Sequence, residues 1–356
     1  MPDQQAPGRA TWPALIGALI KRESLTAAEA AWAMNEIMEG AATPAQIAGF
    51  GVALRMKGET VDELTGLAAA MLDHATPLHV PGRLGDLVGT GGDGARTVNI
   101  STMGAIVAAA AGARMTKHGN RAASSACGAA DVLEALGVKI DLPPSATAQV
   151  AEELGIAFLF APLYHPALRH AGPPRAQLGV PTVFNFLGPV ANPARPQAQA
   201  VGVADPRMGE IIAGVLAGRG CSALVFHGDD GLDELTTTTT STVWVVHESG
   251  VSRLVLDPAE LGLPRSEPGD LRGGDAARNA AVARSVLGGE PGPVADTVLL
   301  NAAAALAAFA GISSDDAVIP LLRDGYARAR EAVRSGAAAQ LLRRWVETSN
   351  RLGSKD

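Results

Sequence analysis

Cysteine is scarce in this sequence, and an excess of basic residues and a long uninterrupted apolar run are both missing. Two cysteines among 356 residues, Cys127 and Cys221, make no disulfide framework, and each lies among apolar or small residues. This scarcity fits a reducing compartment, so we expect a cytoplasmic protein.

The lack of excess positive charge argues against a protein that binds nucleic acid through general charge attraction. The chain has 29 basic and 36 acidic residues, a formal net charge of -7, which gives no general attraction for nucleic acid. A polyanionic ligand must therefore be held by a local pocket. We expect neither nucleic acid nor a membrane as a partner.

No segment is predicted to cross a membrane or to direct secretion. The longest apolar run, 298–312, is rich in alanine, interrupted by Asn301 and too short for a span, so we interpret it as a buried helix. The N-terminal sequence MPDQQAPGRA lacks the apolar core of a signal peptide.

Sequence patterns that mark the starts of helices recur through the first 75 residues. Thr26 with Glu29, Thr43 with Gln46, and Thr60 with Glu63 each match a capping box. These signals predict helices over 12–22, 27–39, 44–57 and 61–74.

From residue 84 onward, short apolar runs alternate with helical stretches, which is typical of an α/β fold with a mainly parallel sheet flanked by helices. The predicted strands are 84–88, 113–116, 156–160, 198–204, 221–227 and 242–247. We therefore predict two domains. A smaller all-helical domain, 1–78, is joined by part of the proline-rich segment 163–196, and an α/β domain covers 79–356.

The stretch 88–102, VGTGGDGARTVNIST, follows the first predicted strand and enters a helix. Its glycines let the backbone approach a ligand closely, and the helix start offers free N–H groups to a phosphate. The alternative is a glycine-rich surface turn followed by a helix cap.

A second motif, KHGNRAASS at 117–125, follows the next strand. Lys117 and Arg121 can neutralise a phosphate, Ser124 and Ser125 can donate to it, and His118 and Asn120 can face a second substrate. The alternative is a solvated basic loop.

A third motif, GDDGLDELTTTTTST at 228–242, is acidic and would repel a phosphate unless a hard cation lay between them. Mg²⁺ commonly bridges one or two carboxylates to substrate phosphates. Asp233 and Glu234 are the best candidates for that role, and Asp229 and Asp230 are better explained as turn formers. The alternative is an acidic surface turn.

Taken in order, GTGGD with NIST, KHGNRAASS, the segment ending GVPTVFNFLGPVANPA, and GLDELTTTTTST resemble the anthranilate phosphoribosyltransferase family. The resemblance covers nearly the whole chain. It implies a fold similar to pyrimidine nucleoside phosphorylases, a homodimer formed through the helical domain, and Mg²⁺ with two ions per subunit. It also implies transfer of phosphoribose from phosphoribosyl pyrophosphate to anthranilate in tryptophan biosynthesis.

The resemblance further implies three sets of site residues. Those that would contact phosphoribosyl pyrophosphate are Gly89, Gly92, Asp93, Thr97, Asn99, Ile100, Ser101, Thr102, Lys117, His118, Gly119, Asn120, Arg121, Ala122, Ala123, Ser124, Ser125 and Ala129. Those that would meet anthranilate are Gly89, Asn120, His165 and Arg175, and those that would hold the metal are Ser101, Asp233 and Glu234. The sequence AGPP before Arg175 and the pair Ala176-Gln177 after it depart from the commoner family pattern.

The reaction requires no covalent nucleophile, because the aromatic amine is unprotonated at neutral pH and the main task is to stabilise the leaving pyrophosphate. His118, Asn120 and Arg121 are therefore interpreted as positioning residues. Two alternatives remain: a pyrimidine nucleoside phosphorylase-like enzyme, which would not need the acidic pair, and a non-catalytic relative that binds nucleic acid.

Overall fold

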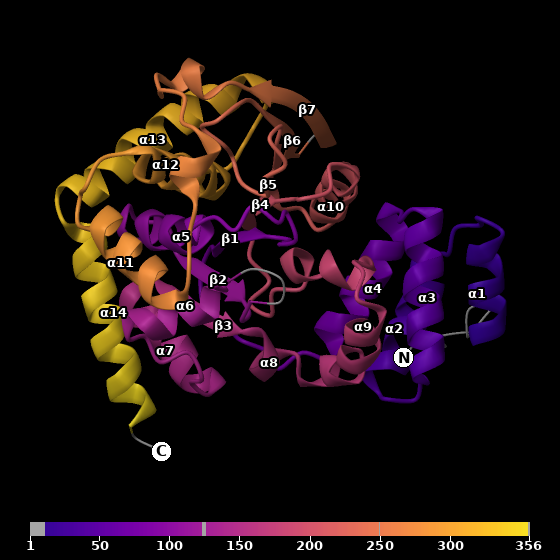
Figure 1. Cartoon of the computed structure of the whole chain (residues 1–356). Coiled ribbons are helices and arrows are strands. Elements are labelled where there is room, and N and C mark those ends of the chain that lie inside the picture. Colours follow the sequence, from indigo (N-terminus) through magenta and orange to yellow (C-terminus); the bar gives the residue numbers. More distant parts are fainter. Residues whose placement is uncertain (1–10, 123–125, 249, 355–356) are drawn as a thin grey trace.

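The computed structural model describes residues 11–122, 126–248 and 250–354. A small helical body lies beside a larger α/β body, and the described chain begins in the first and ends at the far side of the second (Figure 1). The helical body contains α1 (Trp12–Ile20), α2 (Ala27–Met38), α3 (Pro44–Lys57) and α4 (Val61–Asp73). All three predicted capping boxes are formed, which confirms where α2, α3 and α4 begin.

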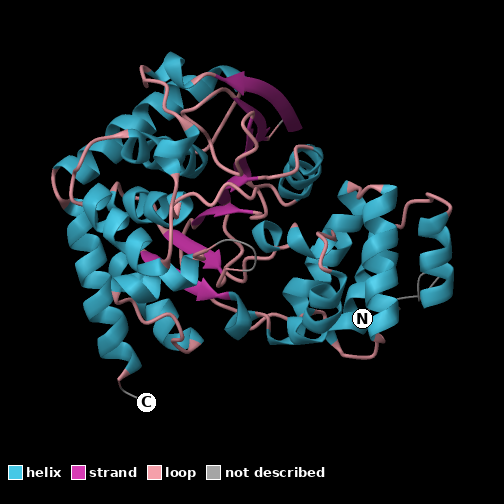
Figure 2. Cartoon of the chain, in the orientation of Figure 1, coloured by secondary structure: helices cyan, strands magenta, loops and turns pink. Residues whose placement is uncertain are grey.

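The larger body is built on one seven-stranded sheet in the order β3-β2-β1-β4-β5-β6-β7 (Figure 2). Its strands are β1 (Gly85–Gly89), β2 (Met115–Gly119), β3 (Ile156–Phe160), β4 (Ala198–Gly202), β5 (Ser222–Gly228), β6 (Ser241–His247) and β7 (Gly250–Leu256). The first five strands are parallel, whereas β6 and β7 are antiparallel. The predicted α/β class is confirmed, and β7 is a strand that the sequence analysis missed.

Helices cover both faces of the sheet. Alternate residues of each strand point to opposite faces, and apolar residues occur on both, so each face must be buried. Leu224 and Val243 belong to a core shared with the long helices α5, α12, α13 and α14, while Val225 and Trp244 belong to a core shared with α10 and the helical body. The bounds are α5 (Ile100–Ala110), α6 (Ala129–Leu136), α7 (Pro144–Leu154), α10 (Arg207–Gly218), α11 (Ala276–Leu287), α12 (Pro293–Ala310), α13 (Val318–Arg334) and α14 (Ala337–Gly353).

The segment between β3 and β4 runs from the sheet to the helical body and back. It contains α8 (Ala161–Tyr164), α9 (Gly172–Leu178) and three 3-10 turns, at Pro166–His170, Val183–Asn185 and Gly188–Val190. Helix α9 packs against α3. Prolines lie in the first turn of α9, where a missing N–H costs no hydrogen bond, so the unusual AGPP sequence still leads into a helix.

Helix α12 is the one helix in the described residues that is long and apolar enough to cross a membrane by length and composition. It is largely buried within the α/β body, as expected for the apolar run 298–312. Asn301, which interrupts that run, is fully buried. A core helix of a globular fold accounts for this pattern.

Candidate active site

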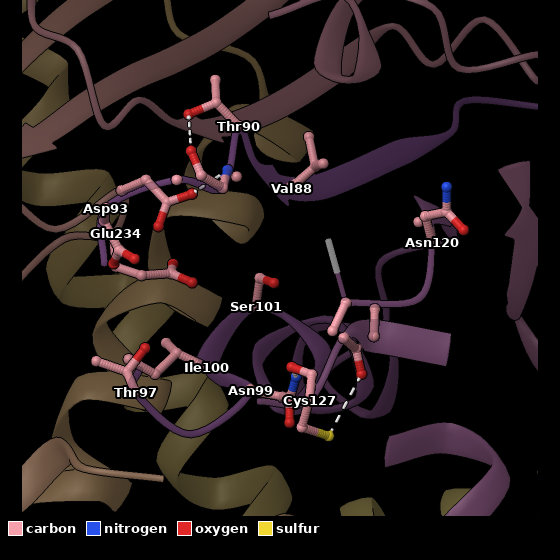
Figure 3. Close-up of a pocket in the computed structure, with 18 of the residues that line it drawn as sticks. Val88, Thr90, Asp93, Thr97, Asn99, Ile100, Ser101, Asn120, Cys127 and Glu234 are labelled. Atoms are coloured by element: carbon pink, nitrogen blue, oxygen red, sulfur yellow. Dashed lines mark hydrogen bonds between the residues drawn. The ribbon is translucent and has the colours of Figure 1, made fainter. Parts of the chain in front are cut away.

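The three motifs meet at one cavity of about 320 Å³. The glycine loop after β1, the first turn of α5, the end of β2 and the acidic pair after β5 all line it (Figure 3). The carboxyl ends of parallel strands share one edge of the sheet, which is where ligands bind in open α/β folds. Gly91 and Asp233, which are 142 positions apart in the chain, therefore come into contact.

Two glycines leave the space that Asp233 occupies. A Cβ at Gly89 would lie 2.2 Å from Asp233 Oδ2, and a Cβ at Gly202 would lie 1.6 Å from the Asp233 carbonyl oxygen. The backbone N–H of Gly91 donates to Asp233 Oδ2 at 2.7 Å. Glycine is needed at these strand ends because the backbone and a carboxylate occupy the space of a side chain.

The acidic side chains concentrate negative charge in this cavity. Asp233 and Glu234 are 9% and 8% exposed, and Asp93 lies near Glu234 in Figure 3. Burial and the Asp93 charge raise the pKa of Asp233 to about 7. Burial and the Asp233 charge raise the pKa of Glu234. The carboxylates are thus held together at an electrostatic cost that a cation would remove.

Lys117 is a buried cation in the wall of the cavity, 2% exposed. Its ammonium donates to the Leu87 carbonyl oxygen at 2.6 Å and to Ser101 Oγ at 3.1 Å. Burial lowers the pKa of Lys117, and the charges of Asp86 and Glu234 oppose that change. Ser101 contacts both Lys117 and Glu234, because its backbone N–H also donates to the Glu234 carboxylate.

The other side chains of the second motif face the same cavity with different partners. Arg121 pairs with Asp131 and Glu134 of α6, so part of its charge is already balanced. Burial and the neighbouring His165 lower the pKa of His118 to about 3, and the two imidazole rings are 5.2 Å apart. A histidine that stays neutral at pH 7 fits the predicted positioning role better than a general base does.

Most residues predicted to contact phosphoribosyl pyrophosphate line this cavity. Thr102 is buried outside the lining, and its hydroxyl has no hydrogen-bond partner in the described structure. Ala123, Ser124 and Ser125 lie outside the described residues. The lining members are Gly89, Gly92, Asp93, Thr97, Asn99, Ile100, Ser101, Lys117, His118, Gly119, Asn120, Arg121, Ala122 and Ala129.

The predicted anthranilate residues are divided between two places. Gly89 and Asn120 line the cavity. His165 lies behind His118, and its Nε2 is 2.8 Å from the carbonyl oxygen of Ala191. Arg175 lies on α9, outside the lining, with its guanidinium 5.6 Å from the centre of the Phe184 ring. The structure therefore assigns Arg175 to the helical side of the molecule.

Two residues that position the site were not singled out by the sequence analysis. Asn301 of α12 accepts from the Leu235 N–H at 3.0 Å and donates to the Leu235 carbonyl at 2.8 Å, which fixes the backbone next to Glu234. Asp131 accepts from the N–H groups of Ala122 and Gly128, at 3.0 and 2.8 Å. An isolated polar residue in an apolar helix was the available signal for Asn301.

We expect Asn301→Ala to lower the free energy of unfolding by about 2 to 5 kcal/mol, because both backbone groups of Leu235 lose a buried partner. Mg²⁺ binding should weaken as well, since the neighbouring Glu234 is no longer held. Urea denaturation and calorimetric titration of Mg²⁺ measure the two effects. Gln340→Ala, at an exposed position of α14, is the control. Unchanged stability in Asn301→Ala would contradict the assigned role.

Together, the fold and the site define a two-domain glycosyl transferase. A model of the glycosyl transferase family helical bundle domain matches residues 13–75, and a model of the a/b domain of that family matches residues 82–339. The chain belongs to the anthranilate phosphoribosyltransferase family, as its relatives show. Anthranilate phosphoribosyltransferase of Thermobifida fusca is 63% identical over 339 residues, which cover 95% of this chain and 97% of the relative. That of Nocardioides sp. is 58% identical over 343 residues, covering 96% and 99%.

Solved structures agree with this assignment. The crystal structure of anthranilate phosphoribosyltransferase from Thermus thermophilus has a TM-score of 0.88 at 44% identity and covers 94% of this chain and 99% of its own. The enzyme from Saccharomyces cerevisiae in complex with PRPP and Mg has a TM-score of 0.85 at 26% identity, covering 97% and 99%. The resemblance found in the sequence is confirmed.

Proposed function

We propose that this chain transfers the phosphoribosyl group of 5-phosphoribosyl 1-pyrophosphate to the amino group of anthranilate in a magnesium-dependent step of tryptophan biosynthesis. The products are N-(5-phosphoribosyl)anthranilate and pyrophosphate. The observation that carries the proposal is the convergence of a glycine loop, a buried lysine and a buried acidic pair on one cavity. The family of the chain defines which substrates occupy it.

The donor set fits Mg²⁺. In the described part of the chain, no group of three His, Cys, Asp or Glu side chains is arranged to hold a metal alone. Asp233, Glu234 and the Ser101 hydroxyl therefore supply part of the oxygen ligands, with water and diphosphate oxygens as the remainder. A bound cation supplies neutralisation of the leaving pyrophosphate. The three carboxylates in this region, with Asp93 included, favour two ions per subunit.

The protein's own groups perform the positioning. The N–H groups of the glycine loop and the first turn of α5 face the diphosphate as fixed dipoles that need no reorganisation when charge develops. Lys117 adds a buried positive charge beside Ser101. Neutral His118 and exposed Asn120 orient the second substrate. Closure of the helical body over the cavity would bring Arg175 to anthranilate and exclude water.

The direct test follows the loss of anthranilate fluorescence on addition of phosphoribosyl pyrophosphate and Mg²⁺. Loss that requires both additions and releases pyrophosphate supports the proposal. Phosphorolysis of a pyrimidine nucleoside without a need for Mg²⁺ would instead support the phosphorylase-like alternative. Tight, salt-sensitive association with DNA would support the non-catalytic one.

We expect Gly92→Ala to weaken phosphoribosyl pyrophosphate binding more than it weakens folding. Gly92 has φ +88°, and a Cβ there meets no protein atom within 4 Å, so the methyl group would enter the cavity itself. Gly262→Ala is the matched control, because Gly262 has φ +76°, equal open space and a place outside this cavity. Calorimetric titration and thermal unfolding compare the two variants. A loss of stability with normal affinity would make the loop purely structural.

The helical body carries the surface for a homodimer. Large apolar side chains are exposed there at Ile20 of α1 (72%), Met56 of α3 (73%) and Val180 after α9 (57%). Helices α1 and α9 both pack on α3, so these side chains belong to adjoining elements. Three exposed apolar side chains on adjoining elements support an interface on this body. The biosynthetic role and the two free cysteines support a cytoplasmic location.

We expect Met56→Arg to dissociate the dimer, because a charge buried without a partner costs far more than the contact contributes. Sedimentation velocity gives the mass of each form. Val255→Arg, on edge strand β7 where Val255 is 56% exposed, is the control that should leave the mass unchanged. A dimer that persists in Met56→Arg would place the interface elsewhere.

A further inference from the structure

A second cavity, of about 480 Å³, lies near the amino ends of the strands and shares no lining residue with the first. One wall is α4 of the helical body, with Thr65, Ala69 and Leu72. The opposite wall comprises Asn192, Arg195, Pro196, Gln197, Gln199 of β4, Arg219 just after α10 and Cys221 just before β5. The cavity therefore lies between the two bodies.

Two arginines and one carboxylate, Asp73 at the end of α4, line this second cavity, so its charged lining is net positive. Arg195 and Arg219 both line it, and burial together with the neighbouring Arg195 charge lowers the pKa of Arg219. Among the described residues, no carboxylate pairs with Arg219, whose Nη1 donates to the Val190 carbonyl at 2.6 Å. Asp73 lies 3.8 Å from Arg195, but both side chains are exposed, so their attraction is weak. An anion entering the cavity would meet two guanidinium groups.

A buried amide in the same wall lacks a partner. Gln199 is 2% exposed, and its Oε1 makes no hydrogen bond in the described structure. By contrast, neighbouring Asn192 donates to Asp86 and Thr116 and accepts from Ala194. Buried polar atoms are nearly always paired, so the orphaned acceptor of a residue that lines the cavity indicates a missing donor.

We propose that this second cavity binds a small organic carboxylate that also carries a hydrogen-bond donor. The two arginines would take the carboxylate, for which a guanidinium offers a planar pair of donors. Gln199 would accept from the ligand's hydroxyl or amino group, and Ala69, Leu72 and Pro196 would contact its apolar part. The volume lies within the range of small-molecule pockets. Such a ligand would touch both bodies at once.

The test is calorimetric titration of 2-hydroxy-4-methylpentanoate into the full chain, with the first cavity saturated by Mg²⁺ and pyrophosphate. Two matched probes separate the contributions: 4-methylpentanoate lacks the hydroxyl donor, and the methyl ester of the hydroxy acid lacks the charge. We expect saturable binding at one site. Loss of the hydroxyl should weaken it about 2 to 10-fold, and loss of the charge about 10 to 150-fold.

Variants test whether the ligand binds in the second cavity. Arg195→Gln should weaken it about 10-fold or more, and Ala69→Trp should abolish it by filling the space from an exposed position of α4. Arg343→Gln on α14 and Ala28→Trp on α2, both at exposed positions, should bind as the unaltered protein does. Absence of saturable binding of the hydroxy acid up to about 20 mM, or normal binding in Ala69→Trp, overturns the proposal.

Discussion

Replacing Glu234 by Gln, or Asp233 by Asn, is expected to lower kcat/KM by about 100 to 1,000-fold, because each change removes charge that stabilises the metal at the leaving group. Folding should survive. The pKa of Asp233 rises from 3.8 to about 7 in the folded protein. At a pH above both values, the charged carboxylate therefore destabilises the folded state, and the neutral amide of Asn removes this effect. Without Mg²⁺, both variants should therefore melt at or above the temperature of the unaltered protein.

Steady-state kinetics across a range of Mg²⁺ concentrations and thermal unfolding with and without the ion measure these effects. Asp229→Asn is the matched control from the same loop, because Asp229 accepts hydrogen bonds from Thr240 and Thr242 and does not line the cavity. It should keep normal Mg²⁺ dependence. The same normal dependence in both Asp233→Asn and Glu234→Gln would refute the metal assignment.

Arg175→Ala is expected to raise the KM for anthranilate by about 10 to 150-fold, because a hydrogen bond to a charged group contributes roughly 1.5 to 3 kcal/mol. Burial lowers the pKa of Arg175, and no carboxylate pairs with it in the described part of the chain, so its charge is available to a ligand. Arg175→Lys should recover only part of the affinity, because an ammonium group cannot reproduce the planar guanidinium.

Kinetics with each substrate varied in turn provide the measurement for Arg175. The KM for phosphoribosyl pyrophosphate should change little, since Arg175 lies on α9, away from the glycine loop. Arg169→Ala, an exposed arginine in the preceding 3-10 turn, serves as the control. An unchanged anthranilate KM in Arg175→Ala would mean that another group binds the carboxylate.

The sequence predicted best what depends on neighbouring residues. The starts of α2, α3 and α4 were found because a capping box is complete within four positions. Strand β7 was missed because its residues alternate between more and less exposed, without the continuous apolar run that marks the buried strands. The three motifs around the cavity were found because each follows a strand in an α/β pattern.

The long-range partners of the site residues could not be predicted from the sequence. Asn301 holds the backbone of Leu235 across 66 positions, and nothing local to either residue specifies that pair. The separation of Arg175 from the cavity depends on how the helical body is placed against the sheet, which residue spacing does not encode. The orphaned Gln199 also becomes visible only when its burial is known.

The seat of Asp233 between Gly89 and Gly202 has a consequence for protein engineering. These three positions lie in separate parts of the chain, yet the residue tolerated at each depends on the residues at the other two. A library that randomises position 89 or 202 alone would mostly sample inactive proteins, because a side chain at either position would collide with Asp233. Recombination with distant homologues should therefore exchange all three positions together.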